Sequence, residues 1–217
     1  MLTVILNWME VWAPLIPLYV FIIKRPNEKH LEIIAAYLLT SLCINLIIDV
    51  SWIFNNCMPP GLKNNNFLYN TISVCRVFFF VLFFMKTTSL LSKKVYNVFL
   101  GLYVLLFANY FTFSADFFTL SSMLHSVEAL GLLTLCILYF IKLIKSDEVF
   151  FVFDPYLIII SGLAIYESVN FFVFLFYSYL MENSGQDFAK VLWRVPNIIF
   201  FVFCLFITTA FYERHSQ

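Results

Sequence analysis

The chain has 217 residues, of which 62% are hydrophobic and only 12% are charged, and its formal net charge at pH 7 is zero. Soluble globular domains carry about 25% charged residues, and they do not repeat apolar runs long enough to cross a bilayer. The composition therefore excludes an ordinary soluble domain, and we expect a lipid bilayer as the main partner and no nucleic acid.

The first apolar run covers residues 2–23 and is expected to be a transmembrane helix. It lacks the basic segment and the small-residue cleavage site of a secretory signal peptide. Pro14 and Pro17 lie inside the run, and each of them removes a backbone N–H donor. The sequence therefore predicts that this helix is kinked.

Six more apolar runs follow, each close to the ~20 residues that a helix needs to cross a bilayer. They cover approximately residues 31–54, 67–85, 96–115, a fifth run ending near 144, 151–181 and 191–212. The connections are short and lie at 24–30, 55–66, 86–94, 114–122, 142–148 and the acidic loop 182–187. We predict an all-α polytopic membrane bundle of seven transmembrane helices, forming a single domain over residues 1–217.

Lysine and arginine are distributed unequally between the two sides of this bundle. One side holds nine, namely Lys24, Arg25, Lys29, Lys86, Lys93, Lys94, Lys142, Lys145 and Arg214. The other side holds two, Lys63 and Lys190. Because positively charged connections stay in the cytoplasm, we predict an outside N-terminus and a cytoplasmic C-terminus for a multi-pass protein of the cell membrane.

The second run contains a polar stripe. Ser41, Asn45, Asp49 and Trp52 follow one another at spacings of four, four and three, which places them on one face of an α-helix. A carboxylate inside a membrane span is costly and by default faces the interior of the bundle. The stripe therefore indicates a polar site between helices.

Polar side chains inside the predicted spans gather in the outer half, whereas the inner half is almost entirely Leu, Ile, Val and Phe. This asymmetry predicts one outward-facing cavity that binds a small polar ligand or an ion. The candidate binding residues are Asp49, Arg76, His125, Glu128, Glu167, Asn170, Arg194 and Asn197.

The same residues also allow a purely structural interpretation, in which they only pair with one another across helices. Asp49 and Arg76 lie on consecutive helices joined by a short loop, so we expect them to be in contact. The acids Glu10, Asp49, Glu128 and Glu167 outnumber the intramembrane bases. At least one acid is therefore expected to hold a proton or to await a cation.

His125 and Glu128 are three residues apart and share a helix face, which is compatible with a proton relay or with a hydrogen-bonded packing histidine. The three histidines are far apart in sequence, and no Cys or His spacing typical of zinc occurs. We expect no metal, no cofactor and no enzymatic activity.

The seventh run also excludes one familiar class of seven-span protein. A retinal protein needs a lysine in the middle of this span, whereas residues 197–208 read NIIFFVFCLFIT. The stretches LHSVEALGLLTLCILYFIKL, DPYLIIISGLAIYESVNFFVF and WRVPNIIFFVF resemble a group of small uncharacterised bacterial seven-span membrane proteins over residues 120–212. The resemblance implies a seven-span fold and brings no activity with it.

Three functions are compatible with this pattern. The first is a membrane sensor or receptor-like protein that binds a ligand from outside and signals through a separate protein partner. The second is a small-solute or proton-coupled transporter, which would need polar groups through the inner half as well. The third is a structural or assembly subunit. The polar outer half and apolar inner half favour the first.

Overall fold

The computed structural model describes residues 8–26, 28–53, 65–88, 91–114, 121–145 and 154–213, and these residues form helices and no strands. The helices are α2 (Met9–Trp12), α3 (Leu15–Lys24), α4 (Lys29–Ile53), α5 (Asn66–Thr87), α6 (Lys93–Asn109) with its π-helical extension η3 (Tyr110–Ser114), α7 (Ser122–Lys145) and α8 (Pro155–Glu213). Six helical segments of the described chain are long and apolar enough to cross a membrane. The predicted helical membrane bundle is confirmed at this level. The predicted connections 55–66 and 114–122 fall largely outside the described residues. The predicted connection 142–148 begins too early, because residues 142–145 are the last residues of α7, and its remaining residues lie outside the described part of the chain.

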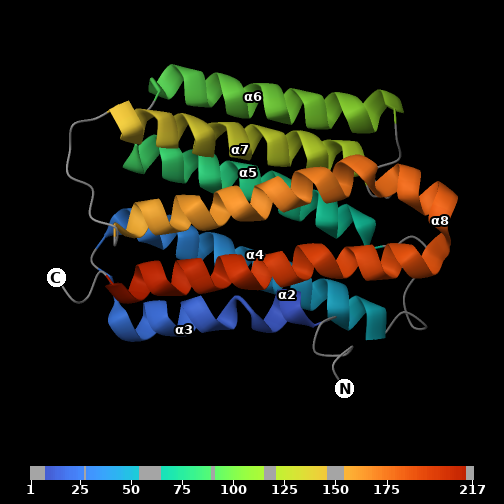
Figure 1. Ribbon diagram of the computed structural model, residues 1–217, viewed down its shortest axis with the longest axis horizontal. Helices are drawn as coiled ribbons and strands as arrows, with labels where there is room; N and C mark the ends of the chain where they lie inside the picture. Colours follow the sequence, from blue (N-terminus) through green and yellow to red (C-terminus); the bar gives the residue numbers. More distant parts are fainter. Residues whose placement is uncertain are drawn as a thin grey trace.

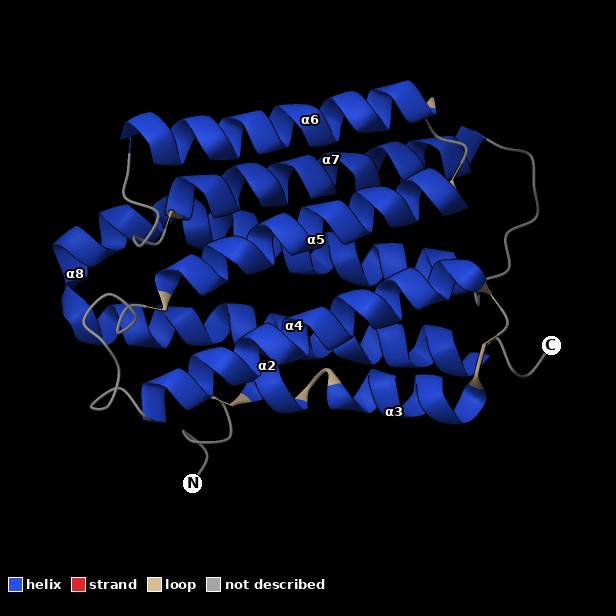
Figure 2. Ribbon diagram, turned by 180° about the vertical axis from the view of Figure 1, so that it is seen from behind, coloured by secondary structure: helices blue, strands red, loops and turns tan. Residues whose placement is uncertain are grey.

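The helices run side by side along one axis. Figures 1 and 2 show α4 and α5 on one side of the bundle and α7 and α8 on the other, with α6 at one edge and α2 and α3 at the opposite edge. Apolar side chains cover the outer surfaces, such as Ile22 on α3, Leu105 on α6 and Phe172 on α8, each at least 60% exposed. Apolar surface of this extent, on helices of this length, fits a lipid environment.

The first predicted span is a broken helix. The chain forms α2, then a short turn through Ala13 and Pro14, then α3. Pro17 falls in the first turn of α3, where a missing N–H donor is tolerated. The expected kink is therefore present, and it is a full interruption. The ring of Trp12 packs on Phe201, and that of Phe21 packs on Phe211, so α2 and α3 follow the last part of α8.

Helix α8 accounts for two predicted spans and folds back on itself. A straight helix of its 59 residues would be about 90 Å long. Figure 1 shows instead two antiparallel arms, and the rings of Tyr166 and Phe203 are stacked between them with centroids 5.5 Å apart. We call Pro155–Tyr177 the first arm and Arg194–Glu213 the second arm. The predicted loop at 182–187 is wrong, because the backbone stays helical there and the chain reverses by bending.

The two ends of the bundle differ. At the bend end α4 ends, α5 and α7 begin, and α8 reverses (Figure 1). At the opposite end, here called the far end, local residues explain where two helices begin or end. Asp154 caps α8 by accepting a 2.9 Å hydrogen bond from the Tyr156 amide, and Pro155 occupies the first helical position, where its missing N–H donor is tolerated. Arg25 closes α3 in the left-handed conformation at φ 43°.

Large aromatic side chains fill the bundle between its middle and the far end. Phe80, Phe83 and Phe84 of α5 are completely buried, and so is Phe211 of the second arm of α8. Phe203 is 1% exposed and lies with its ring centroid 5.8 Å from that of Phe80. This aromatic layer, defined here as these five residues, separates the polar half of the bundle from the far end.

Candidate functional site

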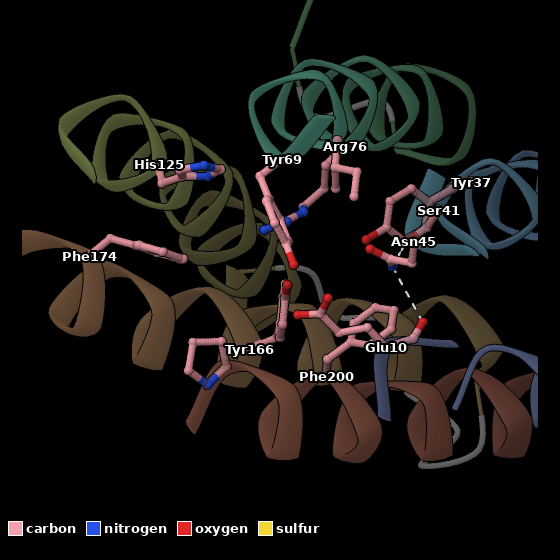
Figure 3. A pocket seen from close by; sticks show the side chains of 12 residues that line it. Glu10, Tyr37, Ser41, Asn45, Tyr69, Arg76, His125, Tyr166, Phe174 and Phe200 are labelled. Carbon is pink, nitrogen blue, oxygen red and sulfur yellow. Dashed lines mark hydrogen bonds between the residues drawn. The ribbon is translucent and has the colours of Figure 1, made fainter. Parts of the chain in front are cut away.

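A small cavity lies between the aromatic layer and the bend end of the bundle. Its walls come from α2, α4, α5, α7 and both arms of α8 (Figure 3). The cavity volume is about 50 Å³. One water molecule needs roughly 10–15 Å³ by this measure, so the space suits a few waters or a small ligand. The lining residues are Glu10, Tyr37, Ser41, Asn45, Tyr69, Ile72, Arg76, His125, Tyr166, Phe174, Pro196 and Phe200.

An ionic cluster lies beside this cavity and is centred on Arg76 of α5. The Arg76 Nε atom is 3.2 Å from Glu128 Oε1 on α7, and its Nη1 atom is 3.7 Å from Glu167 Oε1 on the first arm of α8. The guanidinium also lies 5.1 Å from the ring centroid of Tyr166, which is a cation–π contact. Arg76 is 7% exposed, Glu128 1% and Glu167 0%. The cluster therefore joins three helices through buried ionisable side chains.

Glu128 has the larger share of the polar contacts in the cluster. The Ser73 hydroxyl donates a hydrogen bond to Glu128 Oε2 and lies 2.6 Å from the Tyr103 hydroxyl. Since Ser73 uses its proton on the carboxylate, Tyr103 is the donor in the second bond. His125 Nδ1 is 3.4 Å from the same carboxylate oxygen, and its ring stacks on Phe174 at 4.8 Å. A hydrogen-bonded chain thus runs from α6 through α5 to α7.

Several buried polar atoms next to the cavity make no hydrogen bond. Both carboxylate oxygens of Glu167 are in this state, since 3.7 Å to Arg76 is too long for one. Asn45 Oδ1 and Asn197 Oδ1 are buried in the same way. Buried polar groups are almost always paired in native proteins. Buried polar atoms without hydrogen-bond partners, next to a cavity of this size, are typical of a site that binds water or a ligand.

The structure brings half of the predicted site residues into one place. Arg76, His125, Glu128 and Glu167 form the ionic cluster, and the first two also line the cavity. Asn170 and Asn197 are buried on the two arms of α8, and Asn197 follows the lining residue Pro196. Ligand binding by these residues stays a prediction.

The other predicted site residues lie outside the cluster. Asp49 and Arg194 are half-buried, do not line the cavity and form no ion pair within the described part of the chain. The expected contact between Asp49 and Arg76 is wrong as an ion pair, because the guanidinium faces α7 and α8 and is occupied by Glu128 and Glu167. Adjacency in sequence identified the wrong neighbour for Arg76.

Some lining residues were not predicted as binding residues. On α4, Tyr37, Ser41 and Asn45 line the cavity at spacings of four. They lie on the face that carries Asp49, so the polar stripe begins one turn earlier than the sequence analysis placed it. On α5, Tyr69, Ser73 and Arg76 follow the same helical spacing. Glu10 and Tyr166 also line the cavity. Helical periodicity through tyrosine and serine was the available signal.

Comparisons with known proteins identify no relative. No protein-family model, curated protein or solved structure matches the chain. The resemblance to small bacterial seven-span proteins therefore stays a prediction, and the function is argued from the cavity and the ionic cluster alone.

Proposed function

We propose that the protein is an integral membrane sensor, receptor-like in its action, that binds a small polar ligand or ion in the cavity and signals through a separate protein partner. The observation that carries this proposal is the origin of the cavity walls. They come from α2, α4, α5, α7 and both arms of α8, so one occupant lies against five helices at once. A ligand with different affinity for two helix arrangements shifts the population between them.

The aromatic layer supports a sensor over a transporter. Between the cavity and the far end, Phe80, Phe84 and Phe203 are buried to 1% exposure or less, and none of the three lines the cavity. A transporter needs an alternating path on both sides of its binding site. A signalling protein needs only a packed core that moves as a unit, which close-packed aromatic rings provide.

The proposal includes seven spans and the orientation predicted from the basic residues. Helices α2 and α3 together extend from the level of Phe201 to that of Phe211 along the second arm of α8. This length supports their role as the first span, in addition to the six long apolar helical segments. With the N-terminus outside, the bend end and the cavity face the cell exterior. The far end, with Lys24, Lys93 and Lys145, faces the cytoplasm of a cell-membrane protein.

The orientation is testable with a reporter that is active only in the cytoplasm. We expect activity when the reporter is fused after Gln217, and no activity when the same reporter is placed within residues 55–66. The positive-inside distribution of lysine and arginine is the physical reason. The opposite pattern of activity would place the cavity on the cytoplasmic side and end the proposal of an external ligand.

The sensor function is testable by filling the cavity covalently. Ser41 is a buried lining residue, so Ser41→Cys is nearly isosteric and puts a thiol at the wall. In a background whose five native cysteines are alanine, methyl methanethiosulfonate adds a neutral methylthio group there. We expect hydrogen exchange to change not only at the bend end but also at the far end, in the first turn of α4 and the last turn of α7.

A matched control is Val50→Cys, which lies on the same helix but is exposed on the outer surface. Its modification, verified by mass, is expected to leave exchange at the far end unchanged. If filling the cavity at residue 41 alters exchange only next to the modified side chain, the cavity is not coupled to the cytoplasmic end, and the structural-subunit interpretation becomes the better one.

A further inference from the structure

The cavity and the ionic cluster beside it together hold more acidic than basic groups. Glu10 lines it from α2, and its carboxylate forms no ion pair within the described residues. Figure 3 shows this carboxylate and the hydroxyls of Tyr69 and Tyr166 directed toward the middle of the cavity. Arg76 also lines the cavity, but its charge is shared by Glu128 and Glu167. The cavity and the cluster together therefore hold three carboxyl groups beside one guanidinium and one imidazole, so the acids outnumber the bases by one.

Asn45 adds an acceptor that has no donor. Its Nδ2 atom donates to the Glu10 backbone carbonyl at 3.4 Å and approaches Ser41 Oγ at 3.3 Å. A carbonyl can only accept, so the amide orientation is fixed by chemistry. The Oδ1 atom is then left without a hydrogen bond, although Asn45 is only 5% exposed. An occupant that carries N–H or O–H donors would satisfy it.

The remaining walls are largely aromatic. Tyr37, Tyr69, Tyr166, Phe174 and Phe200 surround the space, and Arg76 already shows that a cation is accepted over the Tyr166 ring. Aromatic faces attract organic ammonium groups, whereas hard metal ions prefer a shell of oxygen ligands. The cavity of about 50 Å³ is small, which favours a compact head with N–H donors over a bulky quaternary group.

We propose that the cavity binds a small ammonium-type cation, either the ammonium ion or the head of a primary alkylamine. Its charge pairs with the Glu10 carboxylate, one N–H donates to Asn45 Oδ1, and the aromatic rings surround the rest. The proposal rests on the ligand site of the proposed sensor and names the class of ligand that the site takes.

The test uses the full-length protein in lipid nanodiscs and follows thermal unfolding in four chloride salts at equal ionic strength. The cations are ammonium, methylammonium, tetramethylammonium and sodium. We expect ammonium or methylammonium to raise the unfolding midpoint by roughly 5–10 °C at a concentration about one hundred times its Kd. Tetramethylammonium lacks N–H donors, and sodium lacks donors and prefers a shell of oxygen ligands, so neither should produce the shift.

Glu10→Gln removes the charge but keeps the shape, and we expect it to weaken methylammonium binding at least tenfold. The matched control is Glu32→Gln, an exposed position on α4 at the far end, which should leave binding unchanged. Glu10 is half-buried and forms no ion pair within the described residues, so Glu10→Gln breaks no salt bridge. The series of salts on the unmodified protein needs no variant.

Equal midpoints in all four salts, or undiminished methylammonium binding by Glu10→Gln, would overturn the proposal. Its failure is distinguishable from that of the sensor function. The neutral methylthio group at residue 41 still reports coupling to the far end if the ligand is not an ammonium cation. Conversely, methylammonium can bind selectively in a protein whose far end does not respond.

Discussion

Arg76→Met is expected to lower the free energy of unfolding by about 3–5 kcal/mol, because removing one member of a buried ion pair leaves the other charges uncompensated. Here two carboxylates would be affected, Glu128 at 3.2 Å and Glu167 at 3.7 Å from the guanidinium. Methionine keeps most of the length of the arginine side chain, so loss of packing contributes little. The measurement is unfolding in mixed micelles with increasing denaturing detergent.

The control is the triple replacement of Arg76, Glu128 and Glu167 by methionine. Buried ionic groups replaced together by apolar residues of similar size are often neutral or stabilising, because the desolvation of all the charges disappears with their attraction. We expect the triple variant to recover most of the stability lost in Arg76→Met. Ser73 would lose its acceptor on Glu128, so recovery should be incomplete.

This pair of variants also separates two interpretations of the cluster. If the triple variant folds stably and still responds to filling of the cavity, the charges are not part of the coupling between the two ends. If it folds stably but the far end no longer responds, the cluster is a functional element. A single replacement that leaves stability unchanged would contradict the geometry itself, because it would mean that Arg76 is not paired with Glu128 and Glu167.

The sequence predicts the helices well and their partners poorly. Hydropathy and length locate the helices closely, since the predicted run 67–85 becomes Asn66–Thr87 and the run 31–54 becomes Lys29–Ile53. The spacing of three residues also places His125 and Glu128 on one face of α7. Each of these signals is contained within one helix, and a helix in lipid must satisfy its own backbone hydrogen bonds wherever it packs.

Contacts between helices depend on how each helix is rotated about its own axis and on which helices pack next to it. Arg76 was expected to meet Asp49 on the preceding helix, yet α5 turns this side chain toward Glu128 and Glu167. Tyr103 carries no local sign of its role, because its hydrogen bond to Ser73 exists only once α6 lies against α5. Similarly, residues 182–187 have the composition of a loop, and the bundle instead bends a continuous helix there.

The two arms of α8 approach each other closely at Gly162. A Cβ atom added at Gly162 would lie 2.6 Å from Phe206 Cβ and 2.8 Å from its Cγ. The Phe206 Cβ atom is fixed by the backbone of the second arm, so no rotamer change can relieve the 2.6 Å contact. At Gly131 an added Cβ would also meet a phenylalanine, but the nearest atom is the far end of the Phe99 ring at 2.8 Å, which can swing away.

We therefore expect Gly162→Ala to force the arms apart and to lower the free energy of unfolding by about 1–3 kcal/mol, the usual range for overpacking by added methylenes. Gly101→Ala is the matched control, since nothing lies within 4 Å of its added Cβ. That change should be neutral or stabilise by roughly 0.5–1 kcal/mol through helix propensity. Equal effects of the two substitutions would show that the arms are not in close contact at Gly162.

Gly162→Ala should also affect ligand binding in the cavity. Tyr166 lies one turn from Gly162, stacks on Phe203 of the second arm, and forms both a wall of the cavity and the aromatic face under Arg76. Separating the arms removes the support of this ring, so we expect Gly162→Ala to weaken methylammonium binding as well as to lower stability. Gly101→Ala should lower neither methylammonium binding nor stability. A variant that loses stability but keeps full binding would show that the position of Tyr166 is set by α4 and α5 rather than by the contact between the arms.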